Sequence, residues 1–201
     1  MLSISFLFED DEENDREEME KHFEDRTNYH IRLVNKYLDK IKGNDSRADS
    51  KLIEEQKNKH DESKFVEPEY EPYLHVNWKY KMKDVGIDYK PGKEIEKEMQ
   101  AATFHHVKTN EHHPEFWDGN STIESINSND RDKAPEKMVD ATKMPSYAII
   151  EMVADWMAMS EEKGTDPYEW AKMNINKRWK FTEEQEDFIY ELLDKIWRKK
   201  K

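Results

Sequence analysis

One stretch of the chain decides the fold class: residues 145–164, with the sequence PSYAIIEMVADWMAMSEEKG. Four of its side chains recur at the spacing of one helical face, namely Ala148, Met152, Asp155 and Met159. Pro145 suits the start of a helix, and Gly164 suits its end. The stretch therefore predicts a helix that packs on one side and carries a carboxylate on its apolar face.

Working outward from this stretch, the same helical spacing recurs along most of the chain. Further helices are expected from about Thr27 to Ile41, from about Ala48 to His60, from after Pro68 to Gly86, from after Gly92 to before Asn110, from Asp166 through Trp179, and from Thr182 onward. The scarcity of glycine, with only 5 residues, agrees with this pattern. The sequence predicts an all-α protein, a single bundle of about six to seven helices.

Two segments outside the expected helices stand out by their composition. Residues 1–26 contain a dense acidic block and are expected to form a solvated, flexible lead-in, which leaves residues 27–201 as the folded domain. Residues 118–134 are rich in Gly, Ser, Asn and Asp and predict a long loop. That loop is either a lid over a site or a surface excursion.

Charge and composition narrow the classes of partner. With 46 acidic and 33 basic residues, the chain carries a formal net charge of −13, which disfavours nucleic-acid binding. The absence of cysteine excludes disulfides, thiolate metal sites and a cysteine nucleophile. The apolar start at residues 1–8 is too short to span a membrane. We expect a cytoplasmic protein, in the host cytoplasm if the chain is viral. The sequence leaves its oligomeric state open.

Three of the expected helices carry a potential metal ligand on an apolar stripe. These ligands are His30, His106 and Asp155, and the end of another helix adds the pair His60-Asp61. A buried carboxylate among Ala and Met side chains is costly unless a cation or several donors accompany it. A metal ion held together with histidines is the simplest partner for Asp155.

The histidines are also clustered along the chain, because four of the eight lie at positions 105, 106, 112 and 113. Adjacent residues on a helix point about 100° apart, so His105 and His106 cannot face the same point, and the apolar stripe favours His106. His112 and His113 lie in an expected loop, where both can turn inward. Nitrogen and carboxylate ligands suit one or two divalent transition-metal ions, whether Mn, Fe, Ni, Co or Zn.

The order of these residues resembles the signature of the HD superfamily of metal-dependent phosphohydrolases. That signature is a helical His, a His-Asp pair, further His residues and a distant helical Asp, here His30, His60-Asp61, the 105–113 cluster and Asp155. The chain is more closely similar to an uncharacterised family of phages and bacteria. That likeness rests on His60-Asp61-Glu62-Ser63-Lys64-Phe65, Phe104-His105-His106, Asn110, His112-His113 and Glu151-Met152 with Asp155-Trp156. The resemblance covers about residues 27–160 and implies an HD-like helical bundle.

The resemblance implies hydrolysis of a phosphoester or phosphoanhydride in a nucleotide or another small phosphorylated molecule. In this interpretation Lys64 contacts the substrate phosphate, and Lys108 and Asn110 are further substrate-binding candidates. Asp61 could bridge two ions, while Glu62 is either an acid/base group or a solvated loop carboxylate. The Gly-Tyr-Pro element of the branch that hydrolyses cyclic dinucleotides is missing, which argues against that substrate.

Two other functions share these residues. Some members of the superfamily hold two irons in a similar ligand set and activate oxygen to cleave a carbon bond. The other alternative is a non-catalytic, metal-stapled helical protein that binds a partner through tryptophans. The tryptophans considered for such an interface are Trp78, Trp156, Trp170, Trp179 and Trp197, although their helical spacing favours a core position.

Overall fold

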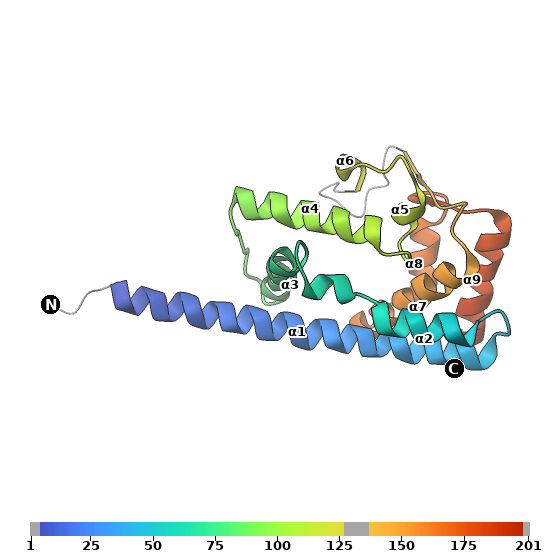
Figure 1. Cartoon of the computed structure of the whole chain (residues 1–201), viewed down its shortest axis with the longest axis horizontal. Coiled ribbons are helices and arrows are strands. Elements are labelled where there is room, and N and C mark those ends of the chain that lie inside the picture. The colour runs from blue at the N-terminus through green and yellow to red at the C-terminus, as the bar shows by residue number, and fades with distance from the viewer. Residues whose placement is uncertain (1–4, 127–136, 199–201) are drawn as a thin grey trace.

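The computed structural model describes residues 5–126 and 137–198, which form an all-α bundle with one pair of two-residue strands (Figure 1). The elements are α1 (Ser5–Asn44), α2 (Ser50–Lys59), the 3-10 helix η1 (Glu62–Phe65), α3 (Tyr70–Asp84), α4 (Lys93–Thr109), α5 (Pro114–Trp117), α6 (Ile123–Ile126), β1 (Val139–Asp140), α7 (Ser146–Lys163), α8 (Pro167–Asn174), β2 (Trp179–Lys180) and α9 (Glu183–Ile196). Seven of the described helices have eight residues or more. The all-α fold class is therefore confirmed.

The first helix is much longer than the sequence predicts. It begins at Ser5, so the expected helix start near Thr27 is wrong, and the acidic block continues α1 instead of preceding it. The reason lies in the stripe of His30, which continues backward through Thr27, Phe23 and Met19, all of them buried. These apolar contacts give the acidic segment a packed side, while Glu17, Glu18, Glu24 and Asp25 are exposed.

The long helix α1 contributes side chains to two apolar clusters. The smaller cluster joins Met19 and Phe23 to side chains of α3 and α4. The main core joins the segment from Leu33 to Ile41 to α2, α7, α8 and α9. His30 lies between these two segments of α1 and is itself buried. A polar residue thus lies at the junction of the two clusters.

Helix α7 forms the centre of the main core and packs against α1 and α9. Its predicted bounds agree with the structure, since it begins at Ser146 and ends at Gly164, whose φ of 65° is the left-handed conformation common at helix ends. The helix expected from Thr182 onward is also present as α9, and Thr182 and Gln185 form a capping box at its start.

Three local predictions differ from the structure. Helix α8 ends at Asn174, because Asn176 takes a left-handed φ of 58°, and Trp179 then lies in β2, which pairs in parallel with β1. The expected loop at 110–117 contains the short helix α5, which begins at Pro114. Within the expected 118–134 loop, residues 123–126 form α6. Residues 127–136 lie outside the described part of the chain, so the lid remains a prediction.

Across the described residues, no helix combines the length and the apolar character that crossing a bilayer requires.

Candidate metal centre

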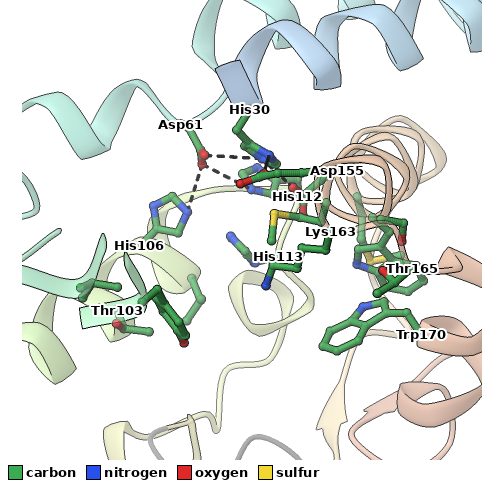
Figure 2. A pocket seen from close by; sticks show the side chains of 18 of the residues that line it. His30, Asp61, Thr103, His106, His112, His113, Asp155, Lys163, Thr165 and Trp170 are labelled. Carbon is green, nitrogen blue, oxygen red and sulfur yellow. Dashed lines mark ion pairs between the residues drawn. The ribbon is translucent and has the colours of Figure 1, made fainter. Parts of the chain in front are cut away.

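Most of the predicted metal ligands meet in one buried place (Figure 2). They come from α1, the end of α2, α4, the link between α4 and α5, and α7, and they are His30, His60, Asp61, His106, His112, His113 and Asp155. All except His113 and Asp155 are fully buried, and these two are half-buried. The candidate centre therefore combines side chains from segments that pack in the smaller cluster with side chains from segments that pack in the main core.

The turn after α2 places two adjacent ligands in the centre. The N–H of His60 closes the helix by bonding to the carbonyl oxygen of Gln56. Asp61 then takes a left-handed φ of 61°, and η1 begins at the next residue. Among non-glycine residues Asn and Asp adopt this conformation most often, and residues held in it cluster at functional sites. In a helix, the side chains of neighbouring residues diverge. Because His60 and Asp61 lie in a turn, both side chains can face the centre.

The ligand atoms fall into two groups that share no residue. One group is His30, His60 and Asp155, and the other is His106, His112 and His113. A third group, made of His60, Asp61 and His112, overlaps both. Within each group the possible ligand atoms lie within 4.8 Å of one another, so each group could hold a metal ion.

Asp61 lies between these two groups and faces each with a different oxygen. Its Oδ2 is 3.9 Å from Nε2 of His30 and 3.9 Å from Nε2 of His60. Its Oδ1 is 3.3 Å from Nε2 of His106 and 4.0 Å from Nε2 of His112. One carboxylate thus faces both groups of possible ligands.

Carboxylates behind the histidines fix the orientation of the rings. Oε1 of Glu151 lies 2.9 Å from Nδ1 of His60 and 3.3 Å from Nδ1 of His112. Oε2 of Glu69 lies 2.9 Å from Nδ1 of His106. Each contact occupies Nδ1 and leaves Nε2 facing Asp61. A carboxylate on the outer ring nitrogen is the usual support of a metal-binding histidine.

Two inward-facing ring nitrogens are buried without any hydrogen-bond partner among the described residues. They are Nε2 of His60 and Nε2 of His113. Buried polar atoms are nearly always satisfied, and leaving one unpaired costs free energy. A cation at the centre would satisfy both atoms, so the residues fit a metal on an observation independent of their spacing.

The protonation states in the ion-free protein follow from these contacts. Burial lowers the pKa of His30, but the hydrogen bond that Nε2 of His30 donates to Asp155, together with the nearby carboxylate of Glu162, outweighs burial and raises the pKa to about 9. Burial raises the pKa of Asp155, yet the bond to His30 brings it down to about 2. Burial, together with the neighbouring His112 and His106, holds the pKa of His113 well below its ordinary value. His30 and Asp155 thus form an ion pair, 2.9 Å apart, whose proton must leave when a metal binds.

Comparison with known proteins places the chain in a family. A model described as a family of unknown function, DUF5662, matches residues 19–195. The chain belongs to the DUF5662 family. No curated protein and no solved structure matches it. The matched range of this DUF5662 member contains every residue of the candidate centre, from His30 to Asp155.

The structure places His105 outside the centre of this DUF5662 protein. Its side chain is 41% exposed, and its Nδ1 lies 2.7 Å from Oε1 of Glu69, behind His106. The reason is the angular separation of neighbours on α4, which directs only His106 inward. His105 therefore contacts Glu69 and belongs to none of the groups of described residues that could hold a metal ion.

Three predicted catalytic or substrate-binding residues have other surroundings. Nζ of Lys108 donates to the carbonyl oxygens of Glu115 and Asp118, at 2.8 and 2.7 Å, and so fixes the backbone around α5. At the end of α4, Nδ2 of Asn110 donates to the carbonyl oxygen of His106 and to Oγ of Ser63, which lies in η1. Glu62 is exposed and lies apart from the cavity lining, which agrees with the solvated interpretation.

Lys64, in contrast, lies at the centre. Its Nζ is 2.6 Å from Oδ2 of Asp61 and 5.3 Å from the centre of the Tyr73 ring. Both Asp61 and Lys64 line a cavity of about 1120 Å³ that also reaches His30, His106, His112, His113 and Asp155. A cation therefore stands beside the ligands, facing a space large enough for a small organic substrate.

The supporting carboxylates were not predicted from the sequence. Glu69 is fully buried just before α3, and Glu162 lies with Oε2 3.6 Å from Nδ1 of His30. Of the three carboxylates, only Glu151 could be linked to the centre from the sequence, because it lies one helical turn before Asp155 on the same face. The contacts of Glu69 and Glu162 depend on how α3 and α7 pack, which the local pattern does not contain.

Proposed function

We propose that this protein is a metal-dependent phosphohydrolase with a two-ion centre, acting on a nucleotide or another small phosphorylated molecule. The observation that supports it best is the position of Asp61, whose two oxygens face two separate histidine groups. The resemblance of the ligand order to the HD superfamily supports the choice of reaction. Fold and ligand set alone do not fix a substrate.

The residues divide naturally between two ions. His30, His60 and Asp155 would hold the first ion, and His106, His112 and His113 the second, with Asp61 shared between them. Nitrogen and carboxylate ligands suit Mn, Fe, Ni, Co or Zn. When bound, such ions supply Lewis-acid polarisation of a phosphoryl oxygen and lower the pKa of a bound water.

Within the chain, Lys64 has the role of binding the phosphoryl group. Its Nζ pairs with Oδ2 of Asp61 at 2.6 Å. If ions held by the centre balanced the charge of Asp61, Nζ of Lys64 would be free to turn toward the cavity that it lines. There the ammonium binds phosphate oxygens and stabilises the charge that develops on them. The Tyr73 ring, with its centre 5.3 Å from Nζ, gives the ammonium a cation–π contact.

Metal analysis of the purified protein tests the proposal. We expect about two transition-metal ions per chain by plasma mass spectrometry of protein prepared without chelator, and hydrolysis in a screen of phosphorylated metabolites. Asp61→Ala should lose metal and turnover while circular dichroism remains helical, and Asp39→Ala, on the exposed side of α1, is the matched control. Protein that contains no metal and takes none up on titration would contradict the proposal.

The di-iron oxygenase is a second candidate, because the same six positions, with Asp61 shared, also suit two irons. Two iron ions per chain, with substrate-dependent oxygen consumption and no phosphate release, would select it. The metal-stapled interaction protein is less favoured. A structural site is normally closed by its ligands, whereas a cavity of about 1120 Å³ reaches these residues.

A further inference from the structure

One tryptophan of the chain is exposed on the wall of the same cavity. Trp78, Trp156 and Trp179 are between 6% and 8% exposed, as core residues are, whereas Trp170 is 38% exposed. Met173 lies one helical turn further along α8, is 53% exposed and lines the cavity too. Two large apolar side chains thus remain in contact with solvent inside the hollow that contains the candidate metal centre.

The exposed indole is held by a stack of buried rings. Trp170 meets Trp179 edge to face, with ring centres 6.3 Å apart, and Trp179 stacks on Trp156 at 5.5 Å. Nε1 of Trp179 donates to Oε1 of Glu115 at 2.8 Å, which fixes the middle ring. Trp156 directly follows Asp155, so the stack leads from Trp170 back to a residue of the candidate centre.

The position of Trp170 in the cavity separates it from the ligands. Figure 2 shows the indole of Trp170 near Thr165, on the opposite side of the view from Thr103 and apart from the cluster around Asp61. The cavity is continuous between the two places, because one set of lining residues includes Asp61, Lys64 and Trp170. A ligand that contacts both places with matching chemistry carries a phosphate at one end and a flat ring at the other.

We propose that Trp170, together with Met173, is the binding site for the planar ring of the substrate. This inference rests on the proposed function, since it assumes that the phosphate lies at Asp61 and Lys64. A nucleobase or similar aromatic ring can stack on an indole whatever its pattern of hydrogen bonds, and the contact contributes about 1–3 kcal/mol per ring. The methionine beside it adds a polarisable contact that adapts to the edge of the ring. Trp170 is therefore a specificity-determining residue for ring-bearing phosphates.

Binding measurements without turnover test this role. The probes are the common nucleosides, their 5′-monophosphates and, as a phosphate without a ring, glycerol phosphate, each titrated by calorimetry into metal-free protein and into protein loaded with the metal found on purification. Trp170→Ala should weaken the binding of the ring-bearing probes about 5- to 150-fold. Trp170→Phe should restore most of it, and glycerol phosphate should bind all variants equally. Tyr29→Ala is the matched control, since Tyr29 is 43% exposed on α1 and lies outside the cavity lining.

Each outcome decides one question. Unchanged binding of ring-bearing probes in Trp170→Ala, equal loss for glycerol phosphate, or no binding of any nucleoside to the native protein would overturn the inference. A change of oligomeric state in Trp170→Ala would also overturn it, because Trp170 would then belong to an interface between copies. If the protein hydrolyses no phosphorylated compound but nucleosides bind in a Trp170-dependent manner, the proposed function fails and the ring site stands.

Discussion

Nδ1 of His60 lies 2.9 Å from Oε1 of Glu151, and the same oxygen lies 3.3 Å from Nδ1 of His112. One carboxylate thus orients a histidine from each of the two ligand groups. Bonds to the two histidines lower the pKa of Glu151 to about 2 despite its burial, so it is ionised throughout the range in which metal could bind. Its charge raises the basicity of both rings.

Glu151→Gln should therefore weaken metal binding about 10- to 100-fold with the helices intact. The neutral amide keeps the shape of the side chain and removes the charge. The measurement is a competition titration against a metal chelator, with circular dichroism as the check on folding. Glu54→Gln is the control, because Glu54 is exposed on α2 and pairs with Lys42. Equal metal affinity of the native protein and Glu151→Gln would remove Glu151 from the centre.

Asp155→Ala should remove one of the two ions and leave the other. Asp155 belongs to the group with His30 and His60, while the group at His106 contains no atom of it. Metal content measured after dialysis should fall from about two ions per chain to about one. Asp61→Ala should instead lower both, since Asp61 faces both groups. A loss of both ions from Asp155→Ala, or of neither, would contradict the assignment of two separate groups.

Lys64→Ala should lower kcat/KM on a phosphorylated substrate by about 10²- to 10³-fold while metal content stays unchanged. The ammonium is the basic group that contacts Asp61, and its removal takes charge stabilisation away from the phosphoryl group. Lys59→Ala, an exposed position at the end of α2, provides the comparison. Full activity of Lys64→Ala would mean that the lysine only balances the charge of Asp61 and does not bind the substrate phosphate.

Asp45→Asn should destabilise the fold in a pH-dependent manner, away from the candidate centre. The Arg47 guanidinium, with help from Lys195, holds the pKa of Asp45 well below its ordinary value. A lowered pKa in the folded state gives stability that is complete above the unfolded pKa of about 3.9 and disappears as the pH falls below it. We expect a loss of about 1–3 kcal/mol at pH 7, moderated because both cations are partly exposed. Urea unfolding at pH 7, 4 and 3 should show the difference from native protein shrinking; a constant difference would exclude this ion pair as its source.

Much of the fold could be predicted from the sequence because most helices are amphipathic and are bounded by Pro, Gly or capping residues. The start of α1 could not, because local charge density outweighs the two apolar residues Met19 and Phe23, whose partners on α3 and α4 are distant in the sequence. The end of α8 was missed for a related reason. Trp179 continues the helical spacing, but its contacts with Trp156 and Glu115 hold it in a short parallel strand.

The candidate centre could be predicted in part, since a polar residue on an apolar helical face is visible in the sequence. That signal indicated His30, His106 and Asp155, which the structure brings together. The roles of Lys108 and Asn110 were not visible, because their hydrogen bonds go to backbone atoms of neighbouring turns. A family resemblance suggests which residues matter but does not distinguish those that hold the backbone from those that meet a substrate.

The position of His30 between the two apolar clusters has a mechanical consequence. His106 comes from α4, on the side of the smaller cluster, and Asp155 comes from α7, in the main core. Ions held by the centre would link α4 and α7 across α1, because ligands from both helices would bind the same pair of ions. A ligand that binds only the folded state shifts the folding equilibrium toward it. Metal binding would therefore make the two apolar clusters unfold together as one cooperative unit. Without metal, the unfolding of the two clusters would be less strongly coupled.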